Sequence, residues 1–157
     1  MSAAYTPGVS NDASDLHARI RAVLEDGPAL RLAVLFGSAA HDRLRAESDV
    51  DIGIIPRDPD LPLSAELTLQ AGLEAACGRT VDLVRLDRAS TLLQWEAARA
   101  GVPIIVDSPH AFSRFAAEAA LDHADLMTTL TPAAERFRQR VAESSPRHPA
   151  HHHRPGD

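Results

Sequence analysis

Two aspartates stand one residue apart at the start of an apolar segment, "SDVDIGII", residues 48–55. Alternate side chains of a β-strand share a face, so Asp49, Asp51 and Gly53 are expected to point one way. A strand rises about 3.3 Å per residue, which separates the two aspartate Cα atoms by about 6.6 Å and lets both carboxylates reach one Mg²⁺ or a pair of ions. The apolar residues between them then face the core: Val50, Ile52 and Ile54.

A third carboxylate, Asp82, lies inside the apolar segment "TVDLVRL", residues 80–86. Aspartate is unfavourable within a strand, so its presence there favours a functional role. If this strand is next to the one that carries Asp49 and Asp51, three carboxylates meet and can bind two metal ions about 3.5–4 Å apart. In the alternative interpretation, all three aspartates lie on a solvated sheet face or at strand ends.

A Gly-Ser pair, Gly37 and Ser38, directly follows the apolar strand "RLAVLF", residues 31–36. Glycine permits a tight turn and the close approach of a ligand. The serine hydroxyl and the free N–H groups at a helix start can hold a phosphate. By itself the pair predicts only a turn. Together with the Ser-Asp-x-Asp that begins at Ser48, it places phosphate donors opposite metal-binding acids, which suits nucleotidyl transfer from a triphosphate.

The elements that must position these residues alternate along the chain between helical and strand patterns. Apolar residues at helical spacing predict a first helix that begins at Ser14 or Asp15, and Pro132 is expected to end the last long helix before a final charged one. Helices are expected at 14–25, 63–77, 89–99 and 110–125, a short one after Gly37, and strands at 31–36, 49–55, 80–86 and 102–107. This alternation predicts a layered α/β (α+β) domain.

Composition and charge limit the functional classes. The chain has 157 residues, enough for one domain, which we place at residues 14–143 between disordered tails at 1–13 and 144–157. Its formal net charge is −6, which argues against direct nucleic-acid binding. All 16 basic residues are arginine, so a mechanism that needs lysine is excluded. The sequence shows neither a signal peptide nor a membrane span, and we expect a soluble cytoplasmic protein.

Other distinctive residues are expected to be structural. The single cysteine, Cys77, excludes an internal disulfide and is expected to pack as a small apolar residue. Trp95, with Leu92 one turn earlier, is expected in the core, with a partner interface as the alternative. The residues Phe112, Phe115 and Ala119 form an apolar stripe that predicts core packing, with a dimer or partner surface as the alternative. Four histidines complete this group: His17, His110 and His123 as structural residues, and His41 near the Gly-Ser turn as a weaker candidate for a ligand contact.

The segment "FGSAAHDRLRAESDVDIGII" resembles the signature of the DNA polymerase β-type nucleotidyltransferase superfamily. More specifically, the chain is similar over about residues 30–107 to the minimal nucleotidyltransferases, MNT, that act as antitoxins beside HEPN-domain toxins. The resemblance implies a nucleotidyltransferase fold: a small mixed sheet of about four strands flanked by helices, with C-terminal helices. Where family members commonly have Ala-Arg-Gly, this chain has Ala-His-Asp, residues 40–42.

The same resemblance assigns roles to the motif residues. It implies that Gly37 and Ser38, with Ser48, contact the nucleotide. Asp49 and Asp51 would hold Mg²⁺, in two ions, and Asp82 would help to bind the catalytic ion and activate the acceptor hydroxyl. The implied reaction transfers AMP from ATP to a tyrosine of a HEPN ribonuclease toxin, which silences the toxin. The implied partners are therefore that toxin and ATP, without a nucleic acid or a membrane, and self-association stays open.

Three alternative functions remain open at this stage. A non-catalytic antitoxin would block its toxin by direct binding, although the presence of all three acids favours catalysis. A nucleotidyltransferase with a small-molecule acceptor would use the same chemistry, but the chain offers no second substrate domain. A metal-dependent glycosyltransferase also uses Asp-x-Asp, yet it has no need of Gly-Ser at this spacing.

Overall fold

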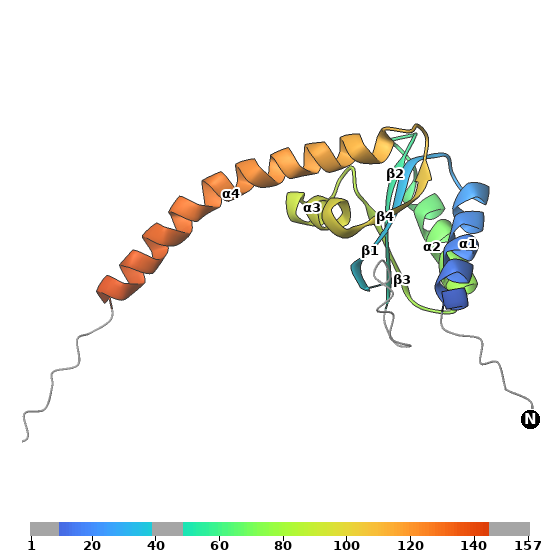
Figure 1. The fold of residues 1–157 in the computed structure, drawn as a ribbon, viewed down its shortest axis with the longest axis horizontal. Helices are drawn as coiled ribbons and strands as arrows, with labels where there is room; N and C mark the ends of the chain where they lie inside the picture. Colours follow the sequence, from blue (N-terminus) through green and yellow to red (C-terminus); the bar gives the residue numbers. More distant parts are fainter. Residues whose placement is uncertain (1–9, 39–48, 145–157) are drawn as a thin grey trace, which may run out of the picture. The chain divides into compact units, whose positions relative to one another are not determined.

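The computed structural model describes residues 10–38 and 49–144, with side chains over 14–38 and 49–140. Four helices and four strands follow one another within these residues (Figure 1). Ser48, His41 and the rest of 39–48, together with residues 1–9 and 145–157, lie outside the described residues. The elements are α1 (Ser10–Asp26), β1 (Leu30–Phe36), β2 (Val50–Pro56), α2 (Leu63–Cys77), β3 (Val81–Arg85), α3 (Thr91–Ala100), β4 (Val102–Val106) and α4 (Ala111–Ser144).

The four strands form one mixed sheet in the order β3-β2-β1-β4. β1 pairs antiparallel with both β2 and β4, whereas β2 and β3 are parallel. Because β3 and β4 are the edges, Pro103 in β4 occupies a position where a missing backbone donor is tolerated. The mixed four-stranded sheet expected from the sequence is confirmed, and so is the α+β class.

Apolar side chains cover both faces of the sheet. One cluster joins α1 and α2 to the sheet, with Ile20 and Leu73 fully buried among the strand residues Val50, Ile52 and Ile54. The second cluster lies on the other face, where Ala97 of α3 and Phe115 of α4 meet Val34. Strand alternation explains the division, because successive β2 residues point to opposite faces. The core side predicted for Val50, Ile52 and Ile54 is therefore confirmed.

Helix α2 matches the predicted bounds 63–77, and Gly78 ends it in a left-handed conformation with φ of 65°. Only some of its apolar residues are buried. Leu63 and Leu67 are 68% and 56% exposed, whereas Leu69, Leu73 and Cys77, spaced four residues apart, face the core. Composition alone could not choose between these faces, because both are apolar. The predicted burial of Cys77 is confirmed, and this burial raises the pKa of its thiol.

A buried arginine, Arg85, connects the end of β3 to the first turn of α2 and to the loop before it. The Arg85 guanidinium donates to Asp87 through two nitrogens, at 2.9 and 2.7 Å, and to Glu66 at 2.7 Å. It also donates to the Pro59 carbonyl oxygen at 3.1 Å. A buried charge is tolerated only when it is paired in this way, so Arg85 fixes the path of β3.

The chain forms two compact units that divide within α4, after His123. In the first unit, Phe115 and Ala119 of α4 are buried, as predicted. Trp95 was expected in the core, but it is half-buried and stacks on His123, with ring centroids 4.8 Å apart. The reason lies in α3, which covers the sheet with Leu93 and Ala97 and leaves Leu92 53% exposed.

The predicted break at Pro132 is wrong, because α4 continues through this residue to Ser144. Proline removes one helical N–H and costs about 3 kcal/mol in a helix interior, which is why the sequence predicted two helices. Good helix formers follow it directly, Ala133 and Ala134. The other predicted bounds shift by a few residues; α1, for example, begins at Ser10 rather than Ser14. Among the described residues, no helix is long and apolar enough to span a membrane.

Candidate functional site

The candidate site lies at one end of the sheet, where β1 ends and β2 and β3 begin. Asp51 pairs with Phe36 of β1 on one side and with Asp82 of β3 on the other. The predicted neighbourhood of the second and third strands is therefore present, and it brings Asp51 and Asp82 into the same register. Asp49 directly precedes β2 at the same end.

Gly37 begins a short 3₁₀ turn with Ser38 after β1. Its φ is 67°, a left-handed conformation that favours glycine. A Cβ atom at this position would overlap the Asp51 carboxylate. The turn after β1 and the aspartate of β2 are therefore in close contact, as the sequence motifs require. The absence of a side chain at residue 37 leaves the space that the Asp51 carboxylate occupies.

The surroundings of Asp51 disfavour the ionised form of its carboxyl group. The side chain is half-buried, whereas Asp49 and Asp82 are exposed. Burial raises the pKa of the Asp51 carboxyl above its ordinary value of 3.8, and the negative charges of Asp82 and then Asp49 raise it further. Within the described residues, none of these three carboxylates has an ion pair with an arginine. Among the described side chains, the site therefore has a local excess of negative charge.

The donor set fits Mg²⁺ held jointly with a ligand rather than an all-protein metal cage. Among the described side chains, no group of three or more His, Cys, Asp or Glu is placed to hold a metal ion. Mg²⁺ does not need such a cage, because it is commonly bound by one or two carboxylates together with phosphate oxygens and water. Carboxylate oxygens and uncompensated negative charge, the features seen at Asp51, are what this ion requires.

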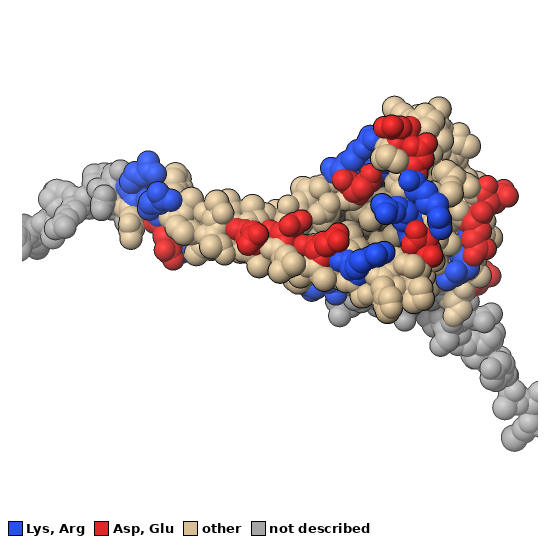
Figure 2. Space-filling view, turned by 90° about the horizontal axis from the view of Figure 1, so that it is seen from above, with Lys and Arg blue, Asp and Glu red and all other residues tan. Residues whose placement is uncertain are grey.

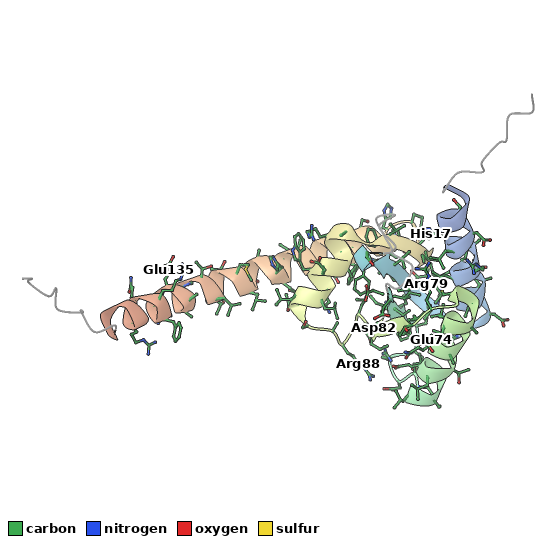
Figure 3. All side chains as sticks on the ribbon, turned by 90° about the horizontal axis from the view of Figure 1, so that it is seen from below. His17, Glu74, Arg79, Asp82, Arg88 and Glu135 are labelled. Atoms are coloured by element: carbon green, nitrogen blue, oxygen red, sulfur yellow. The ribbon has the colours of Figure 1, made fainter. Side chains whose placement is uncertain are left out.

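The edge strand that carries Asp82 is held by side chains that the sequence did not single out. Gln70 of α2 donates to the Val81 carbonyl oxygen at 2.9 Å, and the Val81 N–H donates to Glu74 at 3.3 Å. On the opposite side, the Val50 N–H donates to the Thr80 carbonyl oxygen at 3.0 Å. Figure 3 labels Glu74 on α2 and Asp82 on β3. Polar residues on an otherwise ordinary helix gave no signal for this positioning role.

The structure thus brings together some of the predicted site residues. It places Gly37 against Asp51, and Asp51 beside Asp82, with Ser38 in the adjoining turn. Asp49 is close enough to raise the pKa of Asp51. Ser48 and the Ala-His-Asp segment at 40–42 lie outside the described residues.

A family model described as "Polymerase beta, Nucleotidyltransferase" matches residues 18–110. Similar solved structures include a chain of a toxin–antitoxin complex with AMP-PNP, 27% identical, with a TM-score of 0.69 over 78% of this chain and 98% of that chain. A chain of the tri-AMPylated Shewanella oneidensis HEPN toxin in complex with MNT antitoxin is 25% identical, with a TM-score of 0.66 over 80% and 98%. A chain of a MntA-HepT complex is 26% identical, with a TM-score of 0.64 over 78% and 97%. Among curated proteins, none matches the sequence.

Proposed function

Because the chain belongs to the polymerase beta nucleotidyltransferase family, we propose that it is an antitoxin that transfers AMP from ATP to a tyrosine of a cognate HEPN-domain toxin. The observation that carries the proposal is the contact of the Gly37 turn with Asp51, which pairs in register with Asp82. This geometry supports a site in which a triphosphate lies between the turn and the acidic end of β2. The family expected from the Gly-Ser and Asp-x-Asp motifs is confirmed.

Similarity to solved toxin–antitoxin complexes supports the choice of substrate and partner. One similar structure contains AMP-PNP, an ATP analogue, and another contains an AMPylated HEPN toxin with its MNT antitoxin. In both, at least 98% of the other chain is covered by this one. A chain that matches such a protein along nearly its full length is expected to share its type of partner and its nucleotide.

The site residues receive the following roles in the proposal. Gly37 and Ser38, with Ser48, hold the triphosphate through backbone N–H groups and hydroxyls. Asp49, Asp51 and Asp82 would contribute carboxylates to Mg²⁺, in two ions whose other ligands would be phosphate oxygens and water. The bound Mg²⁺ would supply charge neutralisation and a lowered pKa for the acceptor hydroxyl.

Group transfer then requires an in-line arrangement of acceptor and leaving group. The tyrosine oxygen forms a bond to the α-phosphorus, and the bond from this phosphorus to pyrophosphate breaks. In this proposal the Asp82 carboxylate, which is exposed at the start of β3, accepts the tyrosine proton. Asp51 lies on β2, between β1 and β3. Its negative charge would favour binding of the metal–nucleotide complex over free ATP.

The test is transfer of a radioactive label from ATP to the proposed partner, a cognate HEPN-domain toxin. Label at the α-phosphate is expected to appear on the toxin in the presence of Mg²⁺, whereas label at the γ-phosphate is expected to leave with pyrophosphate. Asp51→Asn and Asp82→Asn should each abolish the transfer. Asp60→Asn, an exposed aspartate in the loop after β2, is the matched control and should leave the transfer unchanged.

The same experiment separates catalysis from simple binding. If Asp51→Asn and Asp82→Asn still neutralise the toxin and no label appears on it with the wild-type chain, the protein acts by direct contact and the proposal is wrong. Transfer of γ-label in place of α-label would make it a kinase-like enzyme and would equally refute AMP transfer.

A further inference from the structure

The C-terminal part of α4, residues 124–144, carries an apolar stripe. Leu126, Leu130, Ala133 and Phe137 follow one another at intervals of four, three and four residues, the heptad spacing of a coiled-coil seam. Leu130 is 47% exposed and Phe137 is 64% exposed. Within the described residues, the stripe is therefore uncovered from Leu130 to Phe137, whereas Leu126 is half-buried; all four residues belong to the second unit, which begins at Ala124.

This segment needs a partner to be a stable helix. Every side chain from Thr131 to Arg140 is exposed, so no tertiary packing within the described chain supports these turns. Pro132 lies among them and costs about 3 kcal/mol in a helix interior. Short isolated helices are marginal in water even without such a cost, and most helical stability in proteins comes from packing of an apolar face.

The charges along the segment are complementary to a second copy of it in the opposite direction. The acidic Asp125 lies directly before the first stripe residue, and the basic Arg136 lies directly before the last one, Phe137. Both precede a seam residue by one position, so they lie on the same flank of the helix. Figure 2 shows the separation, with acidic side chains along the middle of α4 and basic ones near its carboxyl end.

Glu135, an acid near the carboxyl end of α4, does not disturb this pattern. Glu135, labelled in Figure 3, lies two residues before Phe137 and therefore on the side of the helix away from the stripe. The other flank of the seam, at Met127 and Ala134, is apolar and can extend the contact.

We propose that two copies of this chain associate through the C-terminal part of α4, paired antiparallel about a two-fold axis. In this arrangement Leu126 lies opposite Phe137 of the second copy, and Leu130 lies opposite Ala133. Like flanks meet in a two-fold antiparallel pair, so Asp125 of each copy lies near Arg136 of the other. A parallel pair would instead place the acidic turns together and the basic turns together, which is unfavourable.

Self-association of the full chain, measured by sedimentation equilibrium, tests the proposal. The wild-type chain is expected to form dimers, and Phe137→Glu is expected to abolish them. Arg136→Asp should weaken the dimer about tenfold, because both ion pairs become repulsive. The double variant Asp125→Arg with Arg136→Asp should restore it. Arg114→Asp, an exposed arginine earlier in the same helix, is the matched control and should not change the dimer.

Disulfide trapping tests the orientation separately. A mixture of the single variants Leu126→Cys and Phe137→Cys is expected to cross-link, while neither variant alone does, because identical positions lie about 16 Å apart along an antiparallel pair. The native Cys77 is buried and does not compete. A monomeric wild-type chain at all concentrations, or cross-linking of either variant with itself, would overturn the proposal. So would a monomer whose Phe137→Glu variant only loses binding to the toxin, since the toxin would then be the partner of the stripe.

Discussion

Replacing Asp51 by asparagine should make the metal-free protein more stable while it abolishes catalysis. Asp51 and Asp82 occupy paired positions on neighbouring parallel strands, which lie about 4.8 Å apart. At that separation two negative charges repel by about 0.9 kcal/mol in water and about 3.5 kcal/mol at an effective dielectric constant of 20. Asp82 is exposed, so the lower end applies and the expected gain is about 1 kcal/mol.

The sign agrees with the direction of the pKa shift. A carboxyl whose pKa is raised by folding weakens the fold while it is ionised, and Asp51 is such a group. For a chain of 157 residues, about 1 kcal/mol corresponds to a rise in Tm of about 3 °C. Differential scanning calorimetry at pH 7 with a chelator present measures this rise directly.

Addition of Mg²⁺ and ATP should reverse the order of the two proteins. Ligand binding stabilises only the form that binds, so the Tm of the wild-type chain should rise with ligand concentration and that of Asp51→Asn should not. Asp60→Asn is the control for loss of an aspartate charge elsewhere. Its Tm should differ from that of the wild-type chain by no more than about 1 °C, both without ligand and with Mg²⁺ and ATP. If Asp51→Asn lowers the Tm of the metal-free protein, its carboxylate accepts a stabilising bond, and the electrostatic reasoning is refuted.

Three further predictions concern the framework of the site. Gly37→Ala should lower the free energy of unfolding by about 1–2 kcal/mol, because residue 37 has a left-handed φ, and should also remove AMP transfer by displacing Asp51; chemical denaturation and the labelling assay measure the two effects. Arg85→Ala should lower the free energy of unfolding by about 3–5 kcal/mol, because Glu66 and Asp87 lose their buried partner. An unchanged midpoint of urea unfolding would contradict this. Arg85 holds the pKa of the Asp87 carboxyl below its usual value, so the wild-type chain should lose stability as the pH falls below about 4. The Asp87→Asn variant should lose less stability over the same pH interval. Acid titrations followed by circular dichroism measure both losses.

Local patterns were sufficient to predict much of the fold. The run of apolar residues before Gly37 predicted β1, and the alternation after Asp49 predicted which β2 side chains enter the core. The predicted bounds of α2, 63–77, agree with the structure, in which Pro62 precedes the helix and Gly78 ends it. The same kind of evidence failed at Pro132, where the intrinsic cost of proline predicted a break and the surrounding helix formers continued the helix.

The packing of individual side chains was less accessible to sequence reasoning. Leu63 and Leu67 have the same chemistry as Leu69 and Leu73, and only the placement of α2 against the sheet decides which pair is buried. The half-buried stack of Trp95 on His123 depends on the meeting of α3 and α4, which no local pattern reports.

The sequence by itself determined the chemistry of this protein: a glycine and a serine after one strand, and aspartates at fixed spacing before and within the next, because residue types and alternation are local properties of the chain. Only the tertiary structure decided that Asp82 stands beside Asp51, that Gly37 makes room for the Asp51 carboxylate, and that Gln70 and Glu74 hold the edge strand in place. These contacts join residues distant in the chain. They arise from strand order and helix packing, which depend on the burial of the whole core rather than on any one segment.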